Sequence, residues 1–307
     1  MNDHRLFPAA LLLLAAILVA GCDKAPLPPA SSAPPPVSAA AAPDKSAGPA
    51  FAEARARFQT KLVRQSAAPQ DYEEAIPPQG VRKIPYSSGD LKLTAWVTAA
   101  PPAGGKHPAV LFLHGGFAFS AQDWDMAQPY RDAGFVVLMP MLRGENGLPG
   151  HYSMFFHEVD DVLAAADALS GLPYVDAGKL FVAGHSIGGT LTMLACMASP
   201  RFKAAASFSG SPDQIAWSAG QPELVPFDAG NIEEFRIRSP LGFAATFQCP
   251  ARLYHGSEEG FFAGRTVRLA KAAAAAGLDV QCVSVKGDHM SHVKEAMQQS
   301  IAFFQST

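Results

Sequence analysis

One junction, Gly184-His185-Ser186-Ile187-Gly188, constrains the fold of this chain more than any other stretch. An apolar run typical of a buried strand leads into it, and an apolar pattern of helical period follows. The pattern G-x-S-x-G between a strand and a helix is typical of a nucleophile elbow, a sharp turn that presents a serine hydroxyl openly. Gly184 and Gly188 would let neighbouring backbone pass closely there. Ser186 is therefore a candidate nucleophile, although an incidental serine in a Gly-rich turn would give the same pattern.

From residue 81 onward, short apolar runs alternate with segments of helical periodicity. Near-continuous apolar strands separated by helices predict a mainly parallel sheet covered on both faces. The expected fold class is α/β, a mostly parallel, doubly wound sheet with helices on both faces and a short cap insertion. The expected strands are Leu91–Val97, Ala109–Leu113, Phe135–Met139, Leu180–Ala183, Ala204–Ser209, Ala251–Tyr254 and Val280–Val285, and the expected helices are Ala121–Asp132, Glu158–Leu169, Ile187–Ala198, Ala263–Ala276 and Val293–Phe304.

The first residues, 1–21, are predicted to be a targeting segment. Arg5 precedes an apolar run, residues 9–20, that is too short for an ordinary membrane-spanning helix. The run ends in Leu-Val-Ala-Gly before Cys22, which resembles the lipobox of bacterial lipoproteins. The resemblance implies cleavage before Cys22, lipidation of that cysteine and attachment to a membrane of the bacterial cell envelope, on the periplasmic side or the cell surface. An ordinary secretory signal with a chance cysteine is the alternative.

The rest of the chain divides by composition into three parts. Residues 22–50 are rich in Pro, Ala and Ser and are expected to form a disordered tether. Residues 51–80 are expected to hold an N-terminal helix, covering 50–66, and a linker. Residues 81–307 form the main domain. Within it, residues 211–248 interrupt the alternation with many aromatic residues, and we interpret them as a cap-like insertion beside the site.

Charge and cysteine content argue against several classes of protein. The net charge is −3, with no block of like charges, so nucleic acid is not an expected partner. The sequence lacks the C-x-x-C pattern that would indicate a zinc or thioredoxin-like site. Neither a metal nor an organic cofactor is expected. Cys196 is expected to be a core thiol. Cys249 and Cys282 fall beside two expected strands and could form a disulfide.

A serine nucleophile needs a base, and the base needs a carboxylate to orient it. After an elbow of this kind, the acid and then the histidine follow late strands. The loop after the last strand carries His289, our candidate base, with His292 as the alternative nearer the helix. The loop after the preceding strand carries Glu259, our candidate acid, with Glu258 as its competitor. An exposed acidic loop would also explain the glutamates.

The negative charge that develops on a substrate oxygen needs two donors. Ile187 N–H follows the serine at a helix N-terminus, where it can stabilise an anion. The strand that ends at residue 113 leads into His114-Gly115-Gly116-Phe117, an HGG-type loop whose amides can turn inward. The second donor is expected to be the N–H of Gly116 or Phe117.

Taken together, these motifs resemble the α/β-hydrolase catalytic domain of prolyl-oligopeptidase-type serine peptidases. The resemblance covers about Tyr86 to Phe304 and implies Ser186 as nucleophile and His289 as base. It departs from the family in two ways, because residues 51–80 leave no room for the β-propeller of the large members and because the acid is Glu rather than the usual Asp. The motifs that carry it are His114-Gly115-Gly116-Phe117, Pro140-Met141-Leu142-Arg143-Gly144-Glu145-Asn146-Gly147, Pro173-Tyr174-Val175-Asp176, Gly184-His185-Ser186-Ile187-Gly188-Gly189 and Gly287-Asp288-His289.

Three functional hypotheses follow. The first is a serine hydrolase that cleaves peptide or ester bonds through an acyl-enzyme, with peptides preferred through the resemblance. The second is a carboxylesterase with the same residues. The third is a non-catalytic, tethered binding protein on a hydrolase scaffold. The expected partners are a small peptide or ester substrate and a membrane reached through lipid on Cys22; the oligomeric state is open.

Overall fold

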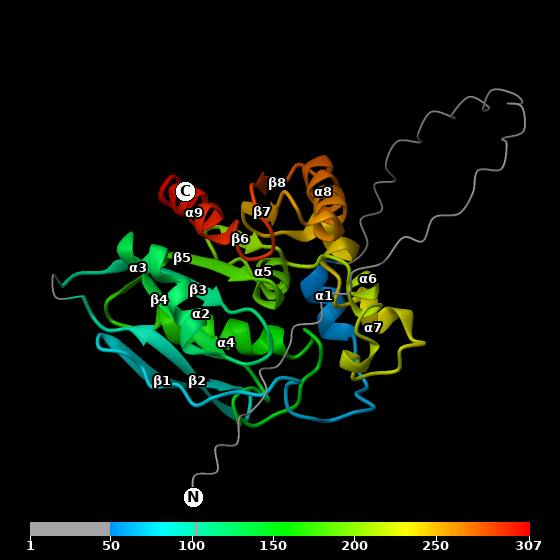
Figure 1. Ribbon diagram of the computed structural model, residues 1–307, viewed down its shortest axis with the longest axis horizontal. Helices are drawn as coiled ribbons and strands as arrows, with labels where there is room; N and C mark the ends of the chain where they lie inside the picture. The colour runs from blue at the N-terminus through cyan, green and yellow to red at the C-terminus, as the bar shows by residue number, and fades with distance from the viewer. Residues whose placement is uncertain (1–49, 102–103) are drawn as a thin grey trace, which may run out of the picture. The chain divides into compact units, whose positions relative to one another are not determined.

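The computed structural model describes residues 50–101 and 104–307, and these form one eight-stranded sheet (Figure 1). The strand order is β1-β2-β4-β3-β5-β6-β7-β8. The β1–β2 and β2–β4 pairs are antiparallel, and all pairs from β4 to β8 are parallel. The predicted fold class, a mostly parallel α/β sheet, is confirmed. The strands are β1 (Val81–Ser88), β2 (Leu91–Thr98), β3 (His107–Leu113), β4 (Val136–Met141), β5 (Val175–His185), β6 (Ala205–Phe208), β7 (Ala251–Gly256) and β8 (Val280–Val285).

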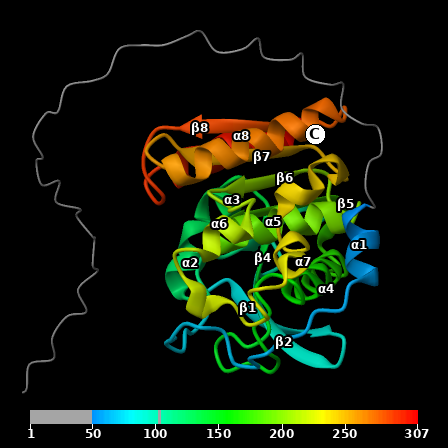
Figure 2. The same cartoon turned by 90° about the vertical axis from the view of Figure 1, so that its right-hand side faces the viewer.

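Helices cover both faces of this sheet because successive strand residues point to opposite sides. In β3, Leu111 and Leu113 face the core shared with α4, α5 and α8, the layer toward the viewer in Figure 2. Val110 and Phe112 face the opposite core, which α2, α3 and α9 complete. The helices are α1 (Phe51–Arg57), α2 (Ala121–Met126), α3 (Gln128–Asp132), α4 (Glu158–Ser170), α5 (Ile187–Ala198), α6 (Gln214–Ser218), α7 (Ile232–Arg236), α8 (Gly260–Ala275) and α9 (Val293–Gln305), with 3₁₀ turns η1 (Pro222–Leu224) and η2 (Pro240–Thr246).

Two expected elements differ in the structure. The strand expected from Leu91 is preceded by a further strand, β1, which pairs with it as a hairpin. The helix expected over 121–132 is two helices, α2 and α3, because Pro129 lies in the first turn of the second. Proline has no N–H to continue a helical ladder and is tolerated only near a helix start. Ser120 caps α2 as expected and forms a capping box with Asp123.

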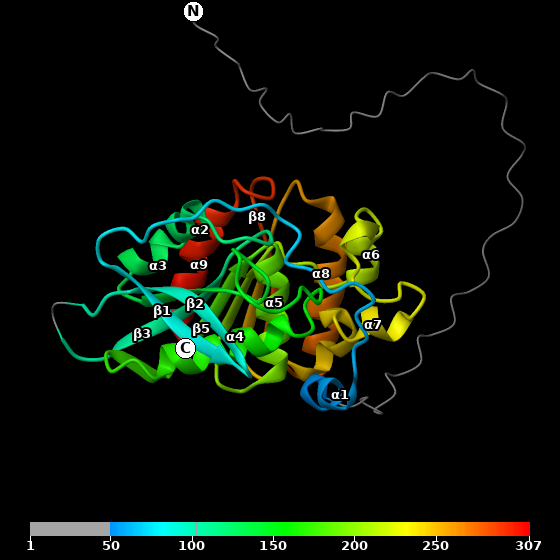
Figure 3. The same cartoon turned by 90° about the horizontal axis from the view of Figure 1, so that it is seen from below.

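The N-terminal helix is shorter than predicted. α1 ends at Arg57, and Phe58 is already extended, so the expected helix over 50–66 is wrong beyond its second turn. Phe51 is buried against Phe243 of η2, at 5.1 Å between ring centroids, so α1 packs on the insertion 211–248. Residues 58–80, which we call the strap, run extended from α1 to β1 (Figure 3). The Val63 and Arg64 amides donate to the Pro226 carbonyl and the Ala68 amide donates to the Gly144 carbonyl, so distant backbone groups take the place of helical partners at these residues.

Several predictions concern residues outside the described part of the chain. The signal segment 1–21, the lipid site Cys22 and the tether up to residue 49 lie there. Among the described residues, no helix combines the length and apolar character needed to cross a membrane.

The described cysteines are free thiols, so the bridge considered between Cys249 and Cys282 does not form. Cys196 is buried in α5, as expected for a core thiol, and burial raises its pKa.

Candidate active site

The elbow at Ser186 has the backbone that its sequence predicts. Ser186 joins β5 to α5 at φ 55° and ψ −116°, a conformation that costs energy for a residue with a side chain. A Cβ on Gly184 would lie 2.4 Å from the Gly188 oxygen, and one on Gly188 would lie 2.1 Å from the Leu113 oxygen. Only glycine fits at either position, which confirms their expected role. The strained turn leaves Ser186 half-buried at the end of its strand.

A histidine and a glutamate meet beside this elbow. His289 Nδ1 lies 2.6 Å from Glu259 Oε1, although the two residues follow different strands, β8 and β7. The Glu259 side chain is only 5% exposed, whereas its competitor Glu258 is exposed. Burial alone would raise the pKa of Glu259, but hydrogen bonds from His289, Ser209 and the Gly256 N–H lower it to about 2. Glu259 is therefore a carboxylate at neutral pH.

Two hydrogen-bond donors, which we call the clamp, hold the second carboxylate oxygen of Glu259. This arrangement was not predicted from the sequence. Gly256 N–H donates to Oε2 at 2.7 Å, and the Ser209 hydroxyl donates to it at 2.5 Å. Ser209 is buried just beyond β6 and has φ 51°. The position of Ser209 in the sequence could have indicated its role, because Ser209 follows β6, the strand beside β7. The carboxyl ends of neighbouring parallel strands meet at one edge of the sheet.

His292, the alternative base, lies on the far side of the same carboxylate. Its ring is fully buried and donates Nδ1–H to the Asp288 carbonyl at 2.7 Å. Its Nε2 lies 3.2 Å from the Ser209 hydroxyl, and burial lowers the pKa of His292. A neutral ring enclosed by protein supports the loop but has no route to a substrate, whereas the His289 side chain is 38% exposed.

His289 is fixed near Ser186 through His185, the last residue of β5. His185 donates Nε2–H to the His289 carbonyl at 2.9 Å, and the two rings lie 4.7 Å apart. Burial and the neighbouring His289 lower the pKa of His185 to about 4, so it is a neutral donor. Phe262 of α8 stacks on the His289 ring at 5.5 Å. The contacts described include no hydrogen bond between Ser186 Oγ and His289, a bond that often tightens only when substrate binds.

The HGG-type loop lies against the elbow, because a Cβ on Gly115 would lie 3.5 Å from Ser186 Cβ. Phe117 N–H donates to the side-chain oxygen of Gln70, a strap residue, at 2.8 Å. Within residues 50–101 and 104–307, neither Gly116 N–H nor Ile187 N–H has a hydrogen-bond partner. Of the two candidates left open in this loop, Gly116 therefore has the free donor.

A buried ion pair holds the HGG-type loop on the side that faces the protein interior. His114 Nε2 lies 3.0 Å from Glu145 Oε2, and both side chains are almost fully buried. Burial favours the neutral ring, but the charge and hydrogen bond of Glu145 outweigh it and raise the pKa of His114 to about 9. The imidazolium donates to both Glu145 and the Gly115 carbonyl, which holds the loop in one conformation.

Aromatic side chains form one wall next to the same loop. Phe117 packs edge-on against Tyr152 at 5.1 Å and near Trp217 of α6 at 6.2 Å. Phe155 lies 5.6 Å from Trp217, so the insertion 211–248 contributes a side chain to this wall. The Tyr152 hydroxyl is buried and has no hydrogen-bond partner among the described residues. The described residues contain no cluster of three His, Cys, Asp or Glu suited to a metal ion.

A doubly wound sheet with a strained serine elbow and a His–Glu pair at one edge defines the class, a serine hydrolase of the α/β-hydrolase fold. The sequence model of the Prolyl oligopeptidase family matches residues 121–304, and the chain belongs to that family. It is 27% identical over 205 residues to an uncharacterised peptidase of Bacillus subtilis, YtmA, a match that covers 60% of this chain and 76% of the relative.

Solved structures share the fold. A puromycin-hydrolysing peptidase of Mycobacterium tuberculosis superposes with a TM-score of 0.64 at 24% identity, over 76% of this chain and 41% of that one. A putative dienelactone hydrolase of Klebsiella pneumoniae gives a TM-score of 0.57 at 18% identity, over 74% of this chain and 98% of that one. The matched region thus spans about two fifths of the peptidase chain and nearly all of the smaller hydrolase.

Proposed function

We propose that this serine hydrolase cleaves peptide or ester bonds through an acyl-enzyme, with peptides preferred. Ser186 is the nucleophile, His289 the general base and Glu259 the residue that orients it. The observation that carries the proposal is the 2.6 Å bond from His289 Nδ1 to Glu259 Oε1, on a loop tied to the residue before Ser186. A neutral histidine bonded through Nδ1–H presents a basic Nε2.

The proposed reaction has two halves. Ser186 Oγ attacks the substrate carbonyl carbon while His289 Nε2 takes its proton, and the carbonyl oxygen becomes an anion held by Gly116 and Ile187 N–H. The carbonyl reforms as His289 returns the proton to the leaving nitrogen or oxygen, which departs as amine or alcohol. Water then attacks the acyl-enzyme with His289 again as base, and the carboxylic acid is released.

The preference for peptides rests on membership of the prolyl oligopeptidase family and on the similarity to YtmA. Within the aromatic wall, the half-buried side chains of Phe117 and Trp217 suit an apolar group of the substrate, because aromatic faces bury large apolar areas. Tyr152 and Phe155 are buried and pack against these two residues.

A carboxylesterase is the second candidate, and two similarities favour it. The chain is 27% identical over 118 residues to a putative esterase of Bacillus subtilis, YitV, across 35% of this chain and 46% of that protein. Its fold also matches nearly the whole putative dienelactone hydrolase. Comparing kcat/KM on matched acyl esters and peptide amides separates the two. Activity confined to esters would contradict the preference for peptides.

We also propose attachment to the bacterial cell envelope through lipid on Cys22. The support is the Leu18-Val19-Ala20-Gly21-Cys22 pattern at the end of a short apolar run. In a bacterial host, the full chain should partition into membranes and incorporate labelled palmitate, and Cys22→Ser should do neither. A Cys22→Ser protein that remains membrane-bound and labelled would contradict the anchor.

The catalytic proposal is tested with a fluorophosphonate probe, which reacts only with an activated serine. The wild-type chain should form one adduct, located on Ser186, and Ser186→Ala should form none. Ser186→Ala and His289→Ala should each lower kcat by about 10⁴ or more, as in known triads. A folded wild-type protein that forms no adduct would instead support the tethered binding protein.

A further inference from the structure

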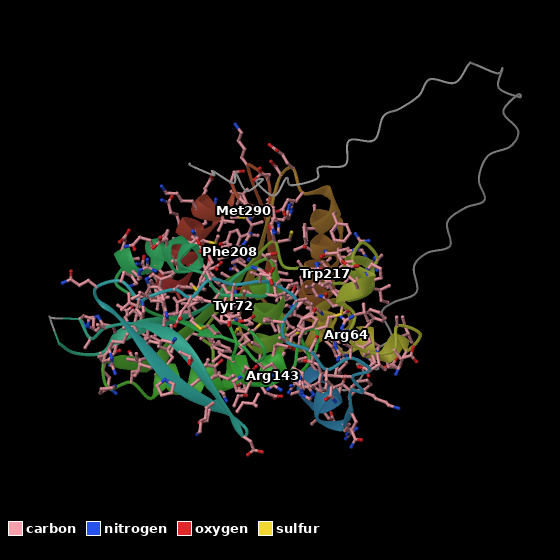
Figure 4. The ribbon with its side chains drawn as sticks, turned by 60° about the horizontal axis from the view of Figure 1, so that its bottom comes forward. Arg64, Tyr72, Arg143, Phe208, Trp217 and Met290 are labelled. Atoms are coloured by element: carbon pink, nitrogen blue, oxygen red, sulfur yellow. The ribbon has the colours of Figure 1, made fainter. Side chains whose placement is uncertain are left out.

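The strap, residues 58–80, is hydrogen-bonded to the surroundings of the site between residues 60 and 70. The Lys61 N–H and the Thr60 hydroxyl donate to Glu234 of α7. Farther along, the Ser66 carbonyl accepts from Tyr152 N–H at 3.0 Å, beside the aromatic wall. Arg64 and Tyr72 mark two points of this course in Figure 4. The strap is therefore bound to the cap, to the wall and, through Gln70, to the HGG-type loop.

The backbone that leads into Gln70 is held by hydrogen bonds. Ala68 N–H donates to the Gly144 carbonyl at 3.0 Å, and Gln70 N–H donates back to the Ala68 carbonyl at 2.9 Å. Two residues beyond, the hydroxyl of the half-exposed Tyr72 side chain reaches the backbone at Gly147. The side chain of Gln70 therefore reaches the loop from a fixed base.

The contact itself involves the loop residue next to Gly116. Gln70 Oε1 accepts the Phe117 N–H at 2.8 Å, and a Cβ on Gly116 would lie 2.6 Å from that oxygen. Gly116 has φ +68°, a conformation that glycine adopts easily and that leaves the loop free to change shape unless something holds it. His114 restrains the loop from the protein interior, and Gln70 restrains it from the outer side.

We propose that Gln70 is a positioning residue for the oxyanion site. Its carboxamide oxygen takes the Phe117 N–H and so fixes the loop with Gly116 N–H as the free donor that joins Ile187 N–H. This inference rests on the proposed acyl-enzyme reaction and adds the strap to the residues that shape its transition state. If instead the Gln70 carbonyl blocked an oxyanion donor and had to leave before catalysis, Gln70→Met would raise kcat and the affinity for a transition-state analogue.

The test replaces Gln70 by Met, which keeps the length of the side chain and removes the acceptor. Gln65→Met is the matched control, because Gln65 lies exposed on the same strap and its side chain makes no described hydrogen bond. An exposed neutral hydrogen bond has a modest net value, so we expect kcat to fall about three- to tenfold in Gln70→Met. KM and the melting temperature should match those of Gln65→Met.

A transition-state analogue gives a readout that a purely structural role would not move. A peptidyl trifluoromethyl ketone, which forms an oxyanion on Ser186, should bind Gln70→Met more weakly by the same factor as the loss in kcat/KM. The simple product acid should bind both variants equally. Unchanged kcat and analogue affinity, or an increase in either, would overturn the inference.

Failure of the proposed function has a separate signature. If wild-type protein forms no fluorophosphonate adduct on Ser186, the acyl-enzyme reaction itself is wrong, whatever Gln70 does. If wild type is labelled and Ser186→Ala is not, the comparison of Gln70→Met with Gln65→Met judges the positioning role alone.

Discussion

The substitution Glu259→Gln changes the charge beside His289 while it keeps nearly the same shape. The Glu259 carboxylate accepts three hydrogen bonds: one at Oε1 from His289 and two at Oε2 from Gly256 N–H and the Ser209 hydroxyl. An amide has only one oxygen. Because Gly256 N–H can only donate, the oxygen of the substituted amide faces Gly256 and its NH₂ group faces His289.

The consequence is the wrong tautomer of the base. An NH₂ group opposite Nδ1 requires Nδ1 to accept, so the ring proton moves to Nε2 and His289 can no longer take the proton of Ser186. A comparable change of a triad aspartate to asparagine lowers kcat by about 10⁴ in a known protease, and we expect a similar loss here. Such a loss corresponds to about 5.5 kcal/mol of transition-state stabilisation.

The assay is steady-state hydrolysis of a chromogenic ester, with fluorophosphonate labelling of Ser186 as a second readout. Glu258→Gln is the matched control, because it makes the same chemical change one residue away on an exposed side chain. Glu258→Gln should retain kcat within about twofold, since surface changes are normally small. If Glu259→Gln keeps kcat within about tenfold of wild type, or Glu258→Gln loses more, the assignment of the acid is refuted.

Three further outcomes follow from particular contacts. Ser209→Ala removes a buried hydrogen bond to the Glu259 carboxylate and should lower the free energy of unfolding by about 2 kcal/mol, measured by urea denaturation, together with a several-fold fall in kcat. Because the pKa of folded His114 beside Glu145 is about 9 against 6.5 in a free chain, its protonation stabilises the fold fully below pH 6.5. That stabilisation, about 3 kcal/mol, is lost as the pH rises through 9, so the urea midpoint of the wild type should fall over this pH range. The urea midpoint of a His114→Gln protein should not show this pH dependence. Gly188→Ala places a methyl group 2.1 Å from a backbone oxygen and should yield little soluble protein, whereas a normal yield and melting temperature would contradict the elbow geometry.

The bounds of an element can be predicted from sequence where its own residues determine where it begins and ends. The helix Ile187–Ala198 is predicted with its observed bounds, because the elbow fixes its start and an apolar face defines its length. Glu259 and His289 can also be placed from sequence, because both follow parallel strands whose ends share one edge of the sheet. The choice of Glu259 over Glu258 follows only from spacing. The structure supplies the physical difference, since one side chain is buried against His289 and the other is exposed.

The strap could not be predicted from its own residues, since its conformation depends on partners far away in sequence. Residues 58–66 continue an apolar stripe of helical spacing, yet the Lys61 N–H bonds Glu234 and the Ser66 carbonyl bonds Tyr152 N–H. Tertiary hydrogen bonds of this kind override a weak local preference. For the same reason, the contact of Gln70 with Phe117 has no local signal.

The clamp on Glu259 gives a physical reason why Glu can replace the family's usual Asp. Glu has one more rotatable bond than Asp, and holding a long side chain in one rotamer costs roughly 1–2 kcal/mol of entropy. Without other contacts, the longer arm would let the carboxylate drift relative to His289, whose ring must stay aligned with Ser186. Two donors on Oε2, Gly256 N–H and the Ser209 hydroxyl, remove that freedom and leave Oε1 for His289 alone. Ser209, at the end of the neighbouring strand, donates to this carboxylate from a backbone with φ 51°, a conformation that costs energy for a residue with a side chain. Ser209 and Glu259 should therefore be regarded as one unit, in which Glu259 contacts His289 directly and a substitution of Ser209 acts on His289 through Glu259.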